Sequence, residues 1–302
     1  MARIDSLSIL LDPSGKDDLA EKYGPVIENL EKATIAGILK NRELSGDPTT
    51  GTVEAKRFAN ATSAAYGTAR AAGKGTGVKA KPVTIAINTD KEIVEEIEEK
   101  DTRLYGVDNV INRRIVNHGR SMERELERAF LQCAKDDGAA LTLTATEINE
   151  KVEELIQKIE TTSNDYVDGV DRDMIAVILD TATYAAMRNF LDTSAYNANI
   201  DSATREFGIF HGVRVYSSVY LPDTVTMVGM ADGSIAQPVM STVMDPVKIQ
   251  LSNAIGFGLF YSYGTEAVMP DLIHYAQEVV ERTARQQQKD AQKPAKEPRE
   301  EA

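Results

Sequence analysis

The pattern of apolar positions is most regular in the middle of the chain. Between 107 and about 136, apolar residues recur every three or four positions, and arginine and glutamate fill the opposite side, which predicts one long amphipathic helix. At 1.5 Å per residue this helix is roughly 42 Å long. Its apolar side carries Ile111, Ile115, Met122, Leu126, Ala129, Phe130 and Cys133. The turn-like cluster Asp136-Asp137-Gly138 ends it, and smaller elements are expected to pack along it.

Shorter periodic segments follow this helix. Thr144 and Glu147 have the spacing of a capping box, and apolar residues behind them predict a helix over 146–161. After a loop, the sequence predicts a buried strand at 174–179, a short helix at 180–191 capped by Asp180, a turn leading into a strand at 208–216, and a break at Leu221-Pro222.

The remaining segments are less regular. Residues 223–238, with Gly229 and Gly233, are predicted to be an exposed loop or hairpin, and strands are predicted at 239–244 and 255–269. At the N-terminal end, 16–44 has helical spacing interrupted at Gly24-Pro25. At the other end, 283–302 is rich in Gln, Lys, Glu and Pro, which is typical of a disordered tail.

Residues 45–82 form an excursion with few bulky apolar side chains. Val83, Ile85 and Ile87 alternate after it, as in a strand, and the Gly-rich stretch 73–77 is suited to a tip. The simplest geometry is a long two-stranded hairpin. An isolated hairpin is marginally stable in water, so we expect this one to be supported by something outside its own subunit.

Two adjacent blocks of the chain carry opposite charge. Residues 90–101 hold seven acidic residues and two lysines, a net −5, and 45–82 hold six basic and two acidic residues, a net +4. These blocks could simply be two solvated faces. Alternatively, the basic loop of one subunit lies on an acidic surface of its neighbour, where complementary charge sets the register. The candidate contact residues are Lys56, Arg57, Arg70, Lys74, Lys79 and Lys81 on the loop, and Glu92, Glu95, Glu96, Glu98 and Glu99 on the acidic run.

Overall charge and composition narrow the class of protein. The formal net charge is −13, which argues against a protein whose main task is to grip phosphate backbones. The single cysteine, Cys133, excludes an internal disulfide. Neither a signal peptide nor the run of about 20 apolar residues needed to span a bilayer is evident, so we expect a protein made in a reducing cytoplasm.

No arrangement of residues predicts catalysis. Gly73-Lys74-Gly75-Thr76 fails the phosphate-loop pattern, and His118, His211 and His274 are scattered over different elements. His118 is expected on or beside the apolar side of the long helix, His211 in a hairpin turn, and Cys133 as a small buried hydrophobe. The best metal candidates are Asp165, Asp168, Asp171 and Asp173, although their spacing matches no calcium loop. We therefore expect no catalytic residues, no cofactor and no metal.

In element order and spacing the chain resembles major capsid proteins of tailed double-stranded DNA bacteriophages, which have the Hong Kong 97 fold. Three stretches carry the resemblance: 81–91 is similar to the returning strand of the family's extended loop, 175–221 to its strand–helix–hairpin unit, and 260–270 to the closing strand of its peripheral domain. The acidic run 90–101 then serves as the linker to the long helix. The resemblance covers about 40–275 and rests on order, since no single motif is diagnostic.

The resemblance implies an α+β fold of named parts. These are an N-terminal arm (1–44), an extended β-hairpin loop (45–89), a peripheral domain (90–136) with a long spine helix at about 107–136, an axial domain (137–238), a return to the peripheral domain (239–275), and a C-terminal tail (276–302).

The function implied is structural, not enzymatic. Subunits would self-assemble into hexamers and pentamers of an icosahedral head that encloses double-stranded DNA without sequence-specific binding. Expected partners are a scaffolding protein, a portal and a decoration protein, and the expected location is the virion after assembly in the host bacterial cytoplasm. Alternatives are an encapsulin-type nanocompartment shell and, from another class, a metal-dependent enzyme using the aspartate cluster.

Overall fold

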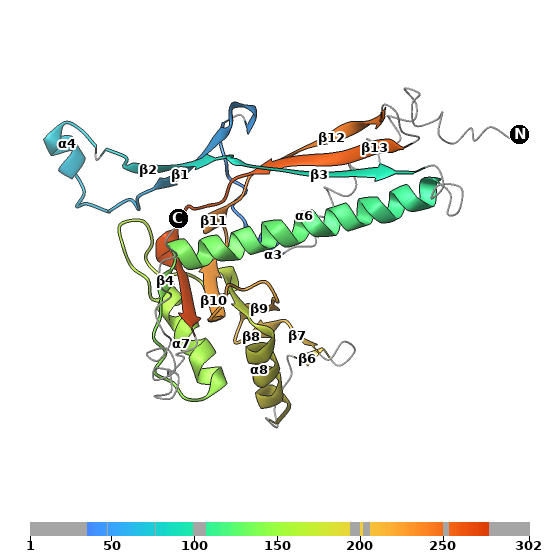
Figure 1. Cartoon of the computed structure of the whole chain (residues 1–302). Coiled ribbons are helices and arrows are strands. Elements are labelled where there is room, and N and C mark those ends of the chain that lie inside the picture. Colours follow the sequence, from blue (N-terminus) through green and yellow to red (C-terminus); the bar gives the residue numbers. More distant parts are fainter. Residues whose placement is uncertain are drawn as a thin grey trace, which may run out of the picture.

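The computed structural model describes residues 35–46, 48–75, 77–98, 107–193, 200–201, 206–249 and 254–277. Two larger sheets and a long hairpin are arranged around the helix α6 (Val107–Asp137). In Figure 1, a sheet of long strands and the hairpin lie on one side of α6, and a second sheet with two helices lies below its C-terminal end. None of the helices in these ranges has the length and apolar composition that a bilayer span requires.

The long helix confirms the strongest prediction from the sequence. It has 31 residues. Met122, Leu126, Phe130 and Cys133 of the predicted apolar side are buried. Leu131 and Ala134 are buried as well, so toward its C-terminal end the apolar side of α6 is broader than one stripe and contacts more than one element.

Below α6 lies a six-stranded sheet in the order β4-β15-β10-β5-β9-β8. Its strands are Ala139–Ala140 (β4), Ile273–Gln277 (β15), Val225–Ala231 (β10), Ile175–Leu179 (β5), Val213–Ser217 (β9) and Ile209–Phe210 (β8). The helices α7 (Ile148–Glu160) and α8 (Thr181–Thr193) contribute to the core on one face, and α6 with the short helix α3 (Ile35–Leu39) to the core on the other.

Because both faces of this sheet are covered, its central strand is apolar throughout. All five residues of β5 are buried: Val177 packs on the side of α7, and Ile178 on the side of α6. A strand buried on both faces appears in a sequence as a continuous apolar run without alternation, which is why the run at 174–179 was correctly predicted as a strand.

The prediction of an exposed loop at 223–238 is wrong. Residues 225–231 form β10, which lies between β15 and β5 in the middle of the sheet and is almost entirely buried. Gly229 suggested a turn, but it serves close packing: a Cβ there would lie 2.8 Å from Cδ1 of Ile159 and 3.0 Å from Cγ of Leu155. Strand β15, which also pairs in this sheet, was not predicted.

The local signals at the helix starts had different outcomes. The Oδ1 atom of Asp180 accepts a hydrogen bond of 2.7 Å from the N–H of Thr183, which confirms the predicted cap of α8. The capping box at Thr144 and Glu147 is wrong, because α7 begins at Ile148 and Glu147 makes no side-chain cap bond. The N–H of Thr144 donates instead to the carboxylate of Glu154, about two turns further along the chain than Glu147.

On the other side of α6, a three-stranded antiparallel sheet has the order β12-β13-β3. Strands β12 (Val239–Lys248) and β13 (Ile255–Tyr263) confirm the two predicted strands, although the second is shorter than predicted. Strand β3 (Thr89–Ile97) is a correction, because the acidic run was expected to be a linker. Its charged residues are compatible with pairing because β3 is an edge strand. A small ladder, β11 (Ile235–Ala236) with β14 (Glu266–Ala267), lies nearby.

The predicted hairpin is confirmed. Strands β1 (Thr52–Phe58) and β2 (Ala80–Ala86) pair antiparallel without a register shift. The short helix α4 (Thr68–Ala72) lies at the far end. Short 3₁₀ turns lie at Pro48–Thr50, Arg172–Met174 and Pro270–Leu272, and a two-residue ladder pairs β6 (Ile200–Asp201) with β7 (Glu206–Phe207).

Only part of each predicted terminal segment can be compared with the structure. Helix α3 at Ile35–Leu39 confirms helical structure near the end of the predicted 16–44 arm, with Ala36 and Leu39 buried against α6. Residues 16–34 of that arm and the predicted disordered tail at 283–302 lie outside the described residues.

Gly264 fixes how closely the hairpin approaches the three-stranded sheet. A Cβ at this position would lie 2.0 Å from the carbonyl oxygen of Ala86, at the end of β2. We expect Gly264→Ala to reduce the free energy of unfolding by about 1–3 kcal/mol, because the two backbones must separate. The matched control is Gly77→Ala, since nothing lies within 4 Å of a Cβ there. Urea denaturation of the unassembled subunit measures both, and equal stability of the two variants would contradict this close approach.

Candidate assembly interface

The distal half of the hairpin has no contacts that bury its side chains. Every described side chain from 60 to 82 is exposed. The exposed residues include large apolar ones, with Tyr66 105% and Val78 81% exposed, and Phe58 at the end of β1 is 57% exposed. A two-stranded ribbon that presents apolar side chains to water on this scale is typical of a surface that binds another protein.

The base of the hairpin, in contrast, is anchored in its own chain. Val53, Ala55 and Ile85 are buried against Ala236 and Val268. Beyond β1, the N–H of Asn60 donates a hydrogen bond of 2.9 Å to the carbonyl oxygen of Asp165. The expectation that all of 45–82 lacks support within its own subunit is therefore wrong for the base of the hairpin.

Among the predicted basic contact residues, Arg57 faces its own subunit. Its guanidinium forms two hydrogen bonds with the carboxylate of Asp271, of 2.5 and 2.8 Å, and it lies 4.9 Å above the ring of Tyr166. Its side chain is only 11% exposed. The charge of Arg57 is therefore already paired within its own subunit, and the inter-subunit contact of Arg57 stays a prediction.

The other basic candidates point into solvent. Lys56 has a marginal contact of 4.0 Å with the half-exposed Glu54 on the same strand. Four further cations, Arg70, Lys74, Lys79 and Lys81, are exposed and have no ion-pair partner within the part of the chain that is described. We call these four the hairpin cations. The structure leaves them available to a partner.

The acidic candidates divide between the two faces of β3. Glu95 points toward α6, where its carboxylate accepts hydrogen bonds from Arg114 and lies 3.0 Å from Nε2 of His118. Burial alone would raise the pKa of Glu95, but these two partners lower it below its usual value. The charge of Glu95 is therefore also paired within the subunit, and its inter-subunit contact stays a prediction.

The remaining candidates on the acidic run are exposed where they are described. Glu92, Glu96 and Glu98 are exposed. Glu99 lies outside the described residues.

The three-stranded sheet has one face covered by α6. Phe257 stacks on His118, and the hydroxyls of Tyr261 and Tyr263 donate hydrogen bonds of 2.8 and 3.0 Å to the carboxylate of Glu125. Burial together with this carboxylate raises the pKa of Tyr263 to about 12. These contacts hold the sheet parallel to the helix and fix which face remains free.

The free face of the sheet combines acidic and apolar groups. In the register of β3 with β13, Glu92 is opposite Phe260, and Glu96 is opposite Gly256. Residues directly opposite each other share a face. Val94 is 46% exposed and Phe260 is 37% exposed. We define the sheet outer face as Asp90, Glu92, Val94, Glu96, Gly256, Gly258, Phe260 and Ser262.

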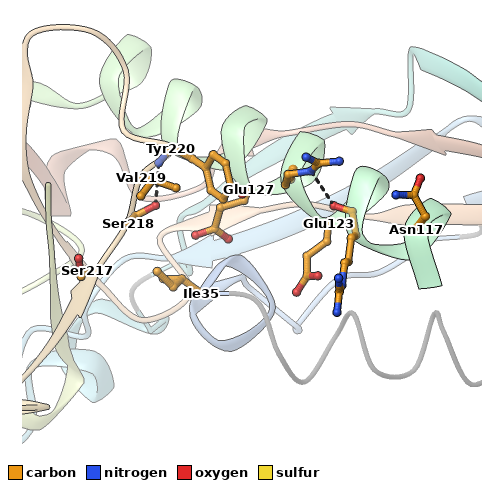
Figure 2. A pocket seen from close by; sticks show the side chains of 10 residues that line it. Ile35, Asn117, Glu123, Glu127, Ser217, Ser218, Val219 and Tyr220 are labelled. Carbon is orange, nitrogen blue, oxygen red and sulfur yellow. Dashed lines mark hydrogen bonds between the residues drawn. The ribbon is translucent and has the colours of Figure 1, made fainter. Parts of the chain in front are cut away.

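A pocket of about 610 Å³ lies between α6 and the segment 217–220 (Figure 2). Its lining includes Glu123 and Glu127 on α6 and the first described residue, Ile35. Glu127 is buried and accepts a hydrogen bond of 3.1 Å from the N–H of Ala36, and burial raises the pKa of its carboxyl. The pocket is thus part of the joint between α3 and α6, and its lining lacks a nucleophile paired with a base.

The structure does not assemble the aspartate cluster into a metal site. Within the described ranges, no three His, Cys, Asp or Glu side chains are close enough to hold one ion. Asp165 and Asp173 contribute backbone carbonyls to hydrogen bonds with Asn60 and Arg214, and the carboxylate of Asp168 accepts from Ser163. These aspartates act as loop and turn residues.

The isolated chemical groups lie where the sequence predicted. His118 is buried on α6, and His211 occupies the turn between β8 and β9 with a positive φ of 48°. Cys133 is buried, and burial raises the pKa of its thiol. The tip glycine Gly73 ends α4 with φ 69° and all its described neighbours are exposed, so the sequence around Lys74 is a loop tip.

Comparison with known proteins identifies the fold. No family model matches the sequence, and no curated protein matches it. Among solved structures, a capsid structure of the cyanophage P-SCSP1u matches with a TM-score of 0.61 at 11% identity, over 81% of this chain and 88% of that one. The chain has the fold of phage capsid proteins. This confirms, at the level of fold, the α+β architecture that the element order predicted.

Two further structures share this capsid fold. A chain from Mycobacterium phage Che8 matches with a TM-score of 0.58 at 18% identity, over 80% of this chain and 90% of that one. A virus-like particle from Pyrococcus furiosus matches with a TM-score of 0.53 at 11% identity, over 85% of this chain and 98% of that one. The likeness extends along nearly the whole length of each of these two chains.

The carboxylate of Asp271 connects the hairpin to the rest of the subunit. Burial alone would raise its pKa, but Arg57 and Asn164 lower it below the ordinary 3.8. We expect Asp271→Asn to reduce the free energy of unfolding at pH 7 by about 1–2 kcal/mol, allowing for partial solvent screening. The pKa of this carboxyl is lower in the folded than in the unfolded protein, so its ionised form stabilises the fold at any pH above the unfolded pKa. This stabilisation is lost as the pH falls through the pKa of the folded protein. The difference between variant and wild type should therefore become smaller as the pH falls from 7 to 3, and disappear only below the folded pKa.

Urea denaturation at pH 7 and pH 3 measures this effect. Glu54→Gln is the matched control, because it removes only the exposed contact with Lys56 on the same hairpin, and we expect no measurable change. A deficit of Asp271→Asn that persists unchanged at pH 3 would show that the ion pair is not its cause.

Proposed function

We propose that this chain is the structural subunit of an icosahedral phage head, which assembles into hexamers and pentamers around double-stranded DNA. The fold shared with the cyanophage capsid supports a shell subunit. The observation that carries the proposal is the hairpin, whose distal half presents apolar and basic side chains that its own subunit leaves exposed. A ring or shell of identical subunits supplies the missing surface by symmetry.

The receiving surface in this proposal is the sheet outer face of the adjacent subunit. It offers Glu92 and Glu96 to the hairpin cations, and Val94 and Phe260 to Val78 or Tyr66. Buried apolar contact would provide most of the affinity, and the complementary charges would set the register of the ribbon on the sheet.

The parts of the subunit take the roles that the capsid fold suggests. Residues 1–44 are the N-terminal arm, 45–89 the extended loop, and α6 the spine helix. We assign 90–136 and 239–275 to the peripheral domain, 137–238 to the axial domain, and 276–302 to the tail. Because β15 pairs with β10, we propose that 273–277 belong to the axial domain instead, so that the peripheral return ends at 272 and the tail begins at 278.

Further partners follow from the same role. A closed head that is filled with DNA needs a portal, and a separate scaffolding protein would guide assembly, with a decoration protein possible on the outside. The mature location is then the virion, after assembly in the host cytoplasm. We infer a structural role without catalysis, since the solved structures that share the fold include a cyanophage capsid.

An encapsulin-type compartment is the second candidate, because the virus-like particle from Pyrococcus furiosus shares the fold. The two functions differ in their contents. A phage head encloses nucleic acid and is made beside a portal, whereas a compartment encloses a protein cargo. Particles from the native source that contain protein cargo and no DNA would favour the compartment.

The direct test is assembly of the purified full-length chain. We expect negative-stain images and analytical ultracentrifugation to show hexamers, pentamers or closed particles, alone or with the co-expressed scaffolding protein. A monodisperse monomer under all of these conditions would overturn the proposed function.

Charge reversal tests the proposed contact between hairpin and sheet. We expect Lys79→Glu with Lys81→Glu to abolish assembly, or to raise the concentration it needs by more than tenfold, because like charges then face each other. Glu92→Lys with Glu96→Lys should have the same effect. Combining all four changes should restore assembly at least in part. Light scattering against protein concentration measures each variant.

The combined variant is its own control. If each pair of substitutions impaired folding, the two losses of stability would add in the combined variant. If each pair disrupts a charge contact, the combined variant restores assembly, because the two charges have exchanged places. Unfolding curves of the unassembled variants should match the wild type, since all four side chains are exposed. If the combined variant does not recover assembly, the sheet outer face is not the surface that the hairpin contacts.

A further inference from the structure

The long helix has a third side that neither sheet covers. Successive residues of a helix are about 100° apart around its axis. His118 faces the three-stranded sheet, where it stacks on Phe257. Arg120 follows two positions later, about 200° around the helix, and therefore lies on the opposite side.

This side carries a row of cations. Arg120, Arg124 and Arg128 are exposed and follow each other at four-residue spacing, which places them next to one another along the surface. Lys135 continues the row and is partly exposed. From Arg120 to Lys135 the row is about 22 Å long. We call these four residues the α6 cation row.

The α6 cation row is not neutralised by its own surroundings. Within the described ranges none of its members has an ion-pair partner: Arg124 donates to the carbonyl of Arg120 and to Ser121, Arg128 lies over the ring of Tyr220, and Lys135 donates to the carbonyl of Asp223. The nearest helix carboxylates, Glu123 and Glu127, line the same pocket as Arg120 and Arg124 but form no ion pair with them. Glu127 is buried and accepts the N–H of Ala36, and Glu123 is partly buried beside it.

The subunit is therefore electrically polarised, although its net charge is −13. The sheet outer face presents Asp90, Glu92 and Glu96, and the opposite side of the α6 layer presents the cation row. A polyanion is repelled by the first surface and attracted by the second. A shell wall built from such subunits has one side suited to phosphate.

We propose that the α6 cation row contacts the phosphates of the enclosed duplex DNA, so that this side of α6 faces the inside of the shell and the sheet outer face points outward. This inference rests on the proposed function. A row of about 22 Å extends along roughly two thirds of a turn of duplex DNA. Its contacts reach the phosphates and carry no base readout, so they are independent of DNA sequence.

The test uses full-length wild-type capsomers and a fluorescent 30-base-pair duplex, with anisotropy measured between 20 and 200 mM NaCl. We expect binding whose affinity falls with salt. Arg120→Gln with Arg124→Gln should weaken binding at least tenfold at the lowest salt and reduce the slope of log affinity against log salt by about 1.8, since each lost phosphate contact removes about 0.9. Arg128 is left intact because it packs on Tyr220.

Two control variants make the result specific. Lys151→Gln with Lys158→Gln changes the net charge equally but on α7, and should leave DNA affinity within twofold. Arg120→Lys with Arg124→Lys keeps the charge of the row and should retain most of the binding. An equal loss from the α6 and α7 variants would overturn the proposal, and so would the absence of salt-dependent binding by wild-type capsomers.

Particle formation by the same variants distinguishes the proposed shell function from the proposed phosphate contact of the α6 cation row. Wild-type particles without DNA affinity would reject the cation row as a phosphate surface and leave the shell function standing; the row would then serve a protein contact. DNA binding through the row by a chain that never assembles would support the phosphate contact and reject the shell function.

Discussion

The structure depends on a single helix that has a different neighbour on each of its sides. The residues Phe130, Leu131 and Ala134 of α6 belong to the core of the six-stranded sheet, whereas His118 and Glu125 hold the three-stranded sheet through Phe257, Tyr261 and Tyr263. A rigid element of 31 residues therefore joins two sheets that do not share a core. The third side of α6 carries the α6 cation row, and these charges are tolerated because that side faces solvent or a partner.

The hairpin shows how far one subunit can support its own elements. Its base is held by buried apolar contacts and by the ion pair of Arg57 with Asp271, so its direction is fixed. Its distal half is too poor in apolar residues to form a core and too exposed to be stable as an isolated ribbon. A hairpin with a fixed base and an unsupported tip is suited to a contact with a neighbour. Because the base already holds the tip in a defined place, binding costs little additional conformational entropy.

Net charge turned out to be a poor guide to the local surface. The net charge of −13 argued against a protein whose main task is to grip phosphate backbones. The fold instead separates charge: acids lie along the edge strand β3, and arginines lie in a row on the far side of α6. Because screening limits the reach of surface charges to about 10 Å, a polyanion near α6 responds to the local row more than to the distant acids.

The sequence by itself determined the elements whose signals are local: the long helix, the buried run of β5, the Asp180 cap, and the hairpin. Their order was also sufficient to predict the capsid fold. It did not determine pairing over long distances. Burial of β10 depends on Gly229 fitting under Leu155 and Ile159, and the partner of Arg57 lies 214 residues away. The acidic run was predicted to be a linker because it is highly charged, yet such charge is tolerated on an edge strand. Only the tertiary structure determines that Glu95 points inward and that Glu92 and Glu96 are exposed. Local periodicity reports which face of an element is apolar; which other element covers that face is decided by packing of the whole chain.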